Sequence, residues 1–180
     1  MRTGGFGAIL HVFFIGRIEM MRVTIVLILA AVFIALGCPD ALLPGGAPYI
    51  MRAMIYPLFH ANVWHLLVNV VSMWGILSRR SSFKELAIAY VISILVYPLS
   101  FRPVVGISNV MYAMLGMRTP CLSSAWWRTA PVAAFLAVTI VMVFIPQFSA
   151  TTHVASFVLG IFVAYARRWK NSVLKDAGLC

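Results

Sequence analysis

The sequence predicts an all-α membrane protein with six transmembrane helices, and three observations lead to this fold class. Of the 180 residues, 63% are hydrophobic and only 10% are charged, and the mean hydropathy is +0.99. The apolar residues come in repeated long runs, unlike the mixed composition of a soluble domain. The basic residues lie between these runs, where they bear on topology. The length corresponds to one domain.

Six apolar segments are the predicted spans. The segment before them, residues 1–20, has an apolar patch too short to cross a bilayer, so we expect an interfacial or poorly ordered leader on the cytoplasmic side. The membrane core then covers residues 21–170, and residues 171–180 form a cytoplasmic tail. The six predicted spans are residues 21–37, 61–77, 83–99, 108–118, 129–145 and 152–165.

The basic residues divide unevenly between the two sides of this predicted bundle. With six spans, twelve of the 14 Lys and Arg residues, Arg22 and Arg118 among them, fall on one side, and only Arg52 and Arg102 on the other. Because basic loops remain in the cytoplasm, both termini are predicted to be cytoplasmic. A net charge of +10 is also typical of proteins that bind nucleic acid. The basic residues form no aromatic-interleaved patch, however, so we expect no nucleic-acid partner.

Five polar residues lie at the outer ends of three predicted spans. His60, His65 and Asn69 open the second span, Ser108 opens the fourth and His153 opens the sixth. Polar side chains are costly in lipid and usually serve a function there. Their common depth on three helices predicts a site that opens to the extracytoplasmic side.

The segment 106–116 places a serine at the head of a short apolar helix. Gly106 allows the backbone to turn, and Ser108 is expected to cap the helix. Ser108, Tyr112 and Gly116 are four residues apart, so they share one helix face. The predicted span is about 16 Å long against roughly 30 Å of hydrocarbon, which places Ser108 below the outer surface, facing a water-filled cavity. The alternative is an N-capped membrane helix in which Gly116 only serves packing.

The residue types at this site favour a serine activated by a histidine. The four acidic residues of the chain are Glu19, Asp40, Glu85 and Asp176. None lies within a span near the five polar residues, which argues against a Ser-His-Asp triad. His60 and His65 are five apart without a neighbouring carboxylate, so no metal ion is expected. Ser108 and His153 can supply the nucleophile and its base.

Donors for an oxyanion are also present in the pattern. The backbone amide at the start of the helix that Ser108 opens is one, and the helix dipole assists it. His65 and Asn69 are four residues apart on one helix face, so both can direct N–H groups to the same place. The sequence thus contains every group that acyl transfer through a serine requires.

Three motifs resemble the signatures of the rhomboid family of intramembrane serine proteases. They are HANVWHLLVN (60–69), GISNVMYA (106–113) and HVASFVLG (153–160). They occur in the family's order, on the corresponding second, fourth and sixth helices, and the resemblance covers roughly residues 21–170. Two positions depart from the family pattern, since Asn109 and Ser156 stand where glycine is common.

The resemblance implies a six-helix rhomboid-like bundle and a Ser-His dyad. It implies that Ser108 is the nucleophile, that His153 is the general base and acid, and that Tyr112 packs under the His153 ring. The oxyanion site would comprise His65, Asn69 and the Ser108 backbone amide. Gly106 and His60 are supporting residues.

The resemblance also implies the partners and the location of the protein. The family cleaves single-pass transmembrane proteins near their outer ends within the lipid bilayer, and no cofactor is expected. The predicted location is the cell membrane, specifically a bacterial inner membrane. Two other functions remain open from the residues: an inactive rhomboid-like protein that binds membrane clients, and a small transporter. An inactive relative typically lacks the serine or the histidine, and a transporter typically shows paired repeats and broken helices.

Overall fold

The described part of the chain is helical throughout, with turns between the helices and no strand. The computed structural model describes residues 4–36, 49–77, 81–100, 104–119, 133, 137, 139, 140 and 149–176. The elements in order are α1 (Gly4–Leu36), α2 (Tyr49–Ile55), the 3-10 helix η2 (Tyr56–Leu58), α3 (Val63–Ile76), α4 (Phe83–Val96), the 3-10 helix η3 (Tyr97–Leu99), α5 (Ser108–Arg118) and α7 (Ala150–Asp176). The predicted all-α class is therefore confirmed for these residues.

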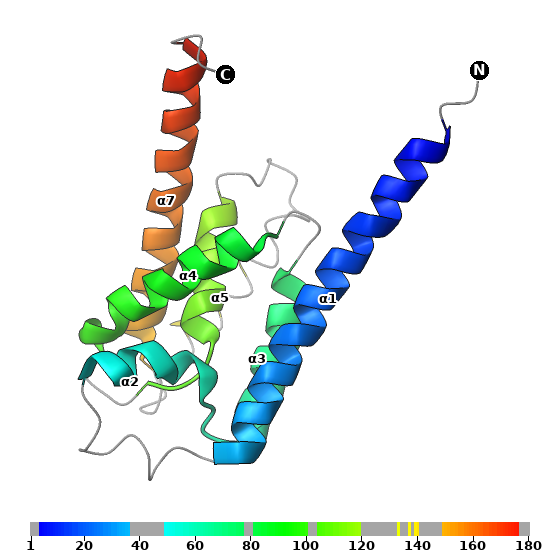
Figure 1. Cartoon of the computed structure of the whole chain (residues 1–180). Helices are drawn as coiled ribbons and strands as arrows, with labels where there is room; N and C mark the ends of the chain where they lie inside the picture. Colours follow the sequence, from blue (N-terminus) through cyan, green and yellow to red (C-terminus); the bar gives the residue numbers. More distant parts are fainter. Residues whose placement is uncertain are drawn as a thin grey trace.

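Helix α5 is the centre of the bundle, and the other helices are arranged around it (Figure 1). It packs against α7, α4 and α3, while α1 packs against α3. Every residue of α5 from Asn109 to Met117 is buried. A short helix that is apolar on all sides has no face for solvent or lipid, so burial among neighbouring helices is the stable arrangement.

Two helices among the described residues are long and apolar enough to cross a membrane. The first lies within α1, at Glu19–Leu36, and the second lies within α7, at Ala150–Ser172. A third is added if the bent pair Tyr49–Leu58 and Val63–Ile76, which meet at 73°, forms one span. The predicted first and last spans overlap these helices closely.

The other predicted spans differ from the helices observed. Helices α3 and α4 have 14 residues each, about 21 Å, which is shorter than a hydrocarbon layer of roughly 30 Å. Helix α4 continues directly into η3, where Pro98 lacks a backbone donor. The helix η2, which contains Pro57, instead continues α2, and residues 59–62 separate it from α3. The predicted span 129–145 lies outside the described residues except for residues 133, 137, 139 and 140.

The N-terminal helix is longer than expected. Helix α1 begins at Gly4 and continues without a break to Leu36, whereas we expected an interfacial or poorly ordered leader before residue 21. The first proline of the chain is Pro39, so no residue interrupts the hydrogen-bond pattern of the helix before that point.

The closest helix contact lies between α5 and α7. A Cβ atom at Gly116 would stand 2.1 Å from the Phe157 carbonyl oxygen, and one at Gly160 would stand 2.2 Å from the Ala113 carbonyl oxygen. The two glycines therefore act reciprocally, each admitting the backbone of the other helix. Small residues allow this approach in membrane bundles, where packing rather than hydrophobic burial holds helices together. Ser156, one turn before Gly160, is fully buried in the same helix.

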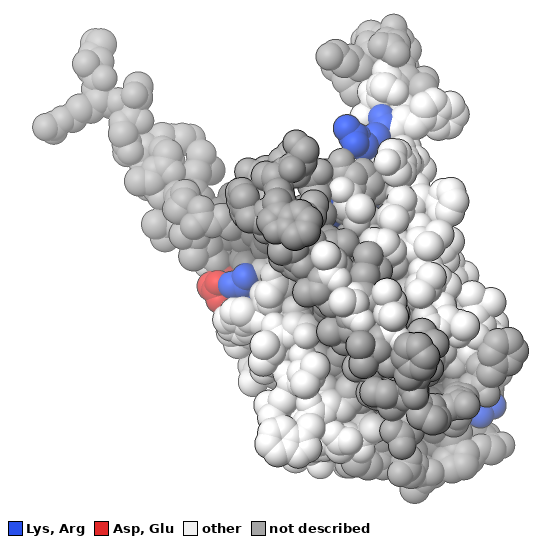
Figure 2. Space-filling model, turned by 180° about the vertical axis from the view of Figure 1, so that it is seen from behind, with Lys and Arg blue, Asp and Glu red and all other residues white. Residues whose placement is uncertain are grey.

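The outer surface of the described helices is largely apolar. On the face shown in Figure 2, most of the described surface carries no Lys, Arg, Asp or Glu side chain. A soluble monomer rarely exposes so much apolar area, whereas a lipid-facing surface requires it. The chain is thus an integral membrane protein. Large apolar side chains exposed on α1, α3 and α7 include Leu27, Ile34, Trp64, Val68, Val71, Phe162 and Tyr165.

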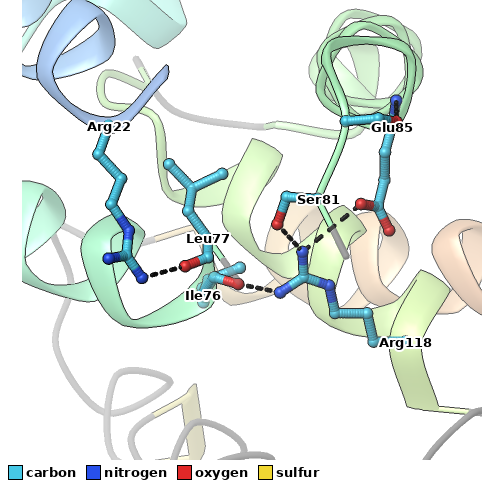
Figure 3. A network of polar contacts seen from close by, with 7 residues as sticks. Arg22, Ile76, Leu77, Ser81, Glu85 and Arg118 are labelled. Atoms are coloured by element: carbon cyan, nitrogen blue, oxygen red, sulfur yellow. Dashed lines mark hydrogen bonds and ion pairs between the residues drawn. The ribbon is translucent and has the colours of Figure 1, made fainter. Parts of the chain in front are cut away.

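An arginine network, formed by Arg22, Arg118, Ser81 and Glu85, joins four helices at the C-terminal end of α3 (Figure 3). Arg22 donates to the Leu77 carbonyl and Arg118 to the Ile76 carbonyl. Arg118 also donates to the Ser81 hydroxyl and lies 3.5 Å from the Glu85 carboxylate. The last carbonyls of a helix have no partner within it, so both guanidinium groups satisfy acceptors that would otherwise be orphaned.

Candidate active site

Ser108 and His153 meet where α5 and α7 begin. The Ser108 Oγ lies 2.8 Å from the His153 Nε2, a hydrogen bond between residues 45 apart in the sequence. His153 is buried and Ser108 is partly exposed. The predicted capping role of Ser108 is wrong, because Ile107 is the N-cap residue and no side chain caps the helix. Ser108 is the first helical residue, and its hydroxyl is directed to the imidazole.

The His153 ring is held by stacking. The Tyr112 and His153 ring centroids are 4.7 Å apart with the planes inclined by 27°, an arrangement of the kind that the family resemblance implies. The Tyr112 hydroxyl in turn forms a hydrogen bond with Thr139. The His153 Nδ1 is buried and has no hydrogen-bond partner among the described residues. Ring packing, rather than a second hydrogen bond, therefore orients this imidazole in the part of the chain described.

Ser108, Tyr112 and Gly116 share one face of α5, as the four-residue spacing predicted, and this face is directed toward α7. Ser108 and Tyr112 both contact His153, and Gly116 lies against the Phe157 carbonyl. The same stripe thus carries a hydroxyl group, an aromatic ring that stacks on His153 and a close helix contact. A bulkier residue at Gly116 would push α7 away and lengthen the distance between Ser108 and His153.

Gly106 brings His65 and Asn69 close to the loop before Ser108. Its φ angle is +104°, in the left-handed region that favours glycine. A Cβ atom here would lie 2.8 Å from the His65 Cε1 and 3.0 Å from both the His65 Nε2 and the Asn69 Nδ2. The turn predicted at Gly106 is confirmed, and the absence of a side chain lets two polar groups reach this backbone.

The two polar groups near Gly106 are oriented as donors. The Asn69 Nδ2 is buried and has no hydrogen-bond partner among the described residues. The Ala61 amide donates to the His65 Nδ1 over 3.4 Å, so in a neutral ring the proton is on Nε2. His60, fully buried, packs edge-on against His65 with 5.3 Å between centroids. The Asn69 Nδ2 and the His65 Nε2 thus both lie on the side that Gly106 leaves open.

The acidic side chains that the structure describes lie elsewhere. Glu19 forms an ion pair with Arg22 at 2.7 Å, and Glu85 forms one with Arg118. Both pairs belong to the opposite end of the bundle from Ser108, because Arg118 closes the helix that Ser108 opens. Within the described residues, the serine and histidine therefore meet without a carboxylate partner.

Sequence reasoning missed Tyr56, a fully buried residue at the site. Its carbonyl accepts from the Gly106 amide at 3.0 Å, and its hydroxyl accepts from the Asn109 Nδ2 at 2.9 Å. One sequence signal points to it: the tripeptide Tyr-Pro-Leu occurs at residues 56–58 and again at 97–99. Both copies form 3-10 helices, and the rings of Tyr56 and Tyr97 lie 4.9 Å apart.

The comparison with protein families identifies a rhomboid domain at residues 47–170. This range contains α2 to α5, most of α7, and all seven residues singled out for the site. The comparisons with curated proteins and with solved structures gave no match. The family match covers well over half of the chain, and it agrees with the three motifs found in the sequence. The chain therefore belongs to the rhomboid family.

Proposed function

We propose that the protein is an intramembrane serine endopeptidase that hydrolyses peptide bonds in or near the transmembrane segments of membrane proteins. The observation that carries the proposal is the 2.8 Å contact between the Ser108 Oγ and the His153 Nε2. A serine hydroxyl is a weak nucleophile until an adjacent base accepts its proton. A partly exposed serine paired with a buried imidazole, in a bundle that faces lipid, suits hydrolysis of a substrate that arrives from the bilayer.

The proposed reaction begins when the Ser108 Oγ attacks the scissile carbonyl carbon. The His153 Nε2 accepts the hydroxyl proton and later gives it to the leaving amine, which produces an acyl-serine ester. Water then attacks the ester while His153 accepts its proton. The carboxylic acid product leaves, and the proton returns to the Ser108 Oγ. Tyr112 keeps the imidazole in place during both transfers, because its ring stacks on that of His153.

The negative oxygen of the tetrahedral intermediate requires donors close to Ser108. The Ser108 amide is one of the unpaired N–H groups at the start of α5, and the helix dipole favours negative charge there. The Asn69 Nδ2 and the His65 Nε2 approach the loop before Ser108 through the space at Gly106. We assign these three groups to the oxyanion site, with His60 supporting the His65 ring.

The test of this proposal is labelling by a fluorophosphonate, which reacts only with an activated serine. We expect the purified protein to be labelled and to cleave a single-pass membrane protein in vesicles. Ser108→Ala should lose both activities and remain folded. Ser172→Ala is the matched control, because Ser172 is exposed on α7 and bonds only the Trp169 carbonyl among the described contacts. Cleavage that persists in Ser108→Ala would rule out this mechanism, and client binding without labelling would indicate an inactive relative.

We further propose six spans, both termini in the cytoplasm and a site that opens to the extracytoplasmic side of a bacterial inner membrane. The charge distribution supports this, and so does the proximity of Arg22 and Arg118 at one end of α3 (Figure 3). A reporter active only in the cytoplasm should work when fused after Lys170 or between Leu77 and Phe83. It should be silent between Pro146 and Thr151. The reverse pattern would place the serine on the cytoplasmic side.

A further inference from the structure

Tyr56 connects three segments of the bundle beside the proposed nucleophile. Its backbone carbonyl accepts from the Gly106 amide at 3.0 Å, and its hydroxyl contacts Asn109 and Ser93, each at 2.9 Å. Tyr56, Ser93 and Asn109 are each fully buried. Gly106 precedes Ser108 by two residues and Asn109 follows it directly, so Tyr56 holds the chain on both sides of the serine.

The end of α4 provides the acceptor for this tyrosine. Pro98 has no backbone N–H, and the Tyr97 amide is directed to the Ile94 carbonyl in the tightened last turn. The Ser93 carbonyl, one residue earlier, then receives the Tyr56 hydroxyl. An acceptor at a helix end that lacks its usual partner needs one from elsewhere. The two identical Tyr-Pro-Leu segments thus have complementary roles. The segment at 97–99 ends α4 so that the Ser93 carbonyl is open to a donor, and the segment at 56–58 supplies that donor, the Tyr56 hydroxyl.

The direction of the hydrogen bonds fixes the Asn109 amide. A tyrosine hydroxyl has one proton, and here it is used on the Ser93 carbonyl. The phenol oxygen can therefore only accept, so the group of Asn109 that faces it is the Nδ2 donor. The chain of donors runs from the start of α5 through Tyr56 to the end of α4. Each link is buried, where an unmade hydrogen bond is costly.

We propose that Tyr56 and Asn109 are positioning residues that fix the backbone around Ser108 for nucleophilic attack. This inference rests on the proposed serine mechanism. Asn109 stands where the resembling family commonly has glycine, and its side chain gives this chain an anchor that glycine lacks. Neither residue touches the reacting atoms. They act through the backbone of residues 106–109, which carries the serine and its amide.

The experiment compares the maximal rate and the half-saturating concentration of fluorophosphonate labelling in the full-length protein. Tyr56→Phe keeps the ring against Tyr97 and removes both hydroxyl contacts. We expect the maximal labelling rate to fall about tenfold, because a small misplacement of the attacking group is expensive in rate. The half-saturating concentration should not change. Asn109→Ala should show the same pattern. The double variant should be no slower than the slower single variant, since both remove one shared interaction.

Tyr90→Phe is the matched control. The Tyr90 hydroxyl also donates from α4 to a backbone carbonyl of the neighbouring segment, that of Met54. Among the described residues it forms no hydrogen bond with residues 106–109. It should lower the melting temperature by less than Tyr56→Phe, because the Tyr90 bond is exposed whereas both hydroxyl bonds of Tyr56 are buried. It should leave the labelling rate per folded molecule unchanged. Equal labelling rates for Tyr56→Phe and Tyr90→Phe would overturn the positioning role. The serine mechanism would still stand in that case, provided that the unmodified protein is labelled. Multiplying effects in the double variant would also overturn it. Absence of labelling in the unmodified protein would overturn both proposals.

Discussion

The two ends of α3 and α5 differ in how their buried polar groups are paired. At the C-terminal ends, the arginine network donates to the Ile76 and Leu77 carbonyls and engages Glu85 (Figure 3). At the N-terminal ends, the polar groups are Ser, Asn and His side chains. Two of their atoms have no partner among the described residues: the Asn69 Nδ2, and the Nδ1 of His153 on the neighbouring α7. At the C-terminal ends charged donors satisfy the carbonyl acceptors, although the Arg22 Nε has no partner among the described residues. At the N-terminal ends the unpartnered groups belong to Asn and His side chains.

We infer from this difference that the C-terminal ends of the two helices serve mainly stability and the N-terminal ends mainly function. Satisfied buried acceptors lower the free energy of the folded state, and losing their donors leaves a desolvation penalty. Unsatisfied buried donors cost free energy in the resting protein, and such groups persist where they serve a function. We therefore expect substitutions at the site to change turnover, and substitutions in the arginine network to change the melting temperature. The following predictions test that division.

The largest effect in this comparison should come from the two side chains that we propose as oxyanion donors. Asn69→Ala and His65→Ala should each lower the turnover of a model transmembrane substrate by about 10²–10³, because one preorganised donor is lost while the Ser108 amide remains. The quantity to measure is the cleavage rate per folded molecule in vesicles. Val71→Ala, which changes an exposed side chain of the same helix, is the control. Unchanged turnover in both variants would remove these side chains from the mechanism.

Arg118→Met should have a smaller effect, and it should lower the stability of the protein rather than its turnover. This variant keeps an apolar stem and removes the donors to the Ile76 carbonyl and to Ser81, and it leaves the partly buried Glu85 carboxylate without its ion pair. We expect a loss of about 2–4 kcal/mol in the free energy of unfolding. The melting temperature in detergent measures it.

The turnover per folded molecule should stay near that of the unmodified protein in Arg118→Met. Adding Glu85→Gln should recover part of the lost stability, because the unpaired carboxylate is then neutralised. A large fall in turnover without a fall in melting temperature would show that the arginine network acts on the site. It would contradict the assignment of stability to one end of the helices and function to the other.

The smallest effect should come from Glu19→Gln. Glu19 pairs with Arg22 at 2.7 Å, but its side chain is 45% exposed. Exposed ion pairs contribute about 0–1 kcal/mol, and Arg22 keeps its bond to the Leu77 carbonyl and its position over the Trp74 ring. The melting temperature should barely change. A drop as large as that of Arg118→Met would mean that Arg22 depends on Glu19 for its orientation.

Local features of the sequence predicted much of the molecule. Long apolar runs predicted helices throughout. The span expected at residues 21–37 overlaps α1, which ends at Leu36, and the span expected at residues 152–165 lies within α7. Spacing of four residues placed Ser108, Tyr112 and Gly116 on one face, and a glycine predicted the turn at residue 106. Three short motifs indicated the rhomboid family. These are properties of composition and of helical period, which a sequence carries residue by residue.

Other features depended on which segments meet in space. Ser108 was expected both to cap its own helix and to face His153. In the structure Ile107 is the N-cap, and the Ser108 hydroxyl lies 2.8 Å from the His153 Nε2, 45 residues away. Tyr56 and Asn109, separated by 53 residues, form a buried contact that no local pattern shows. The sequence alone determined which groups are present, how helical each segment is and which of its faces carries each group. Only the tertiary structure decided which donor meets which acceptor, because several polar groups compete for partners in an apolar bundle and helix packing selects among them.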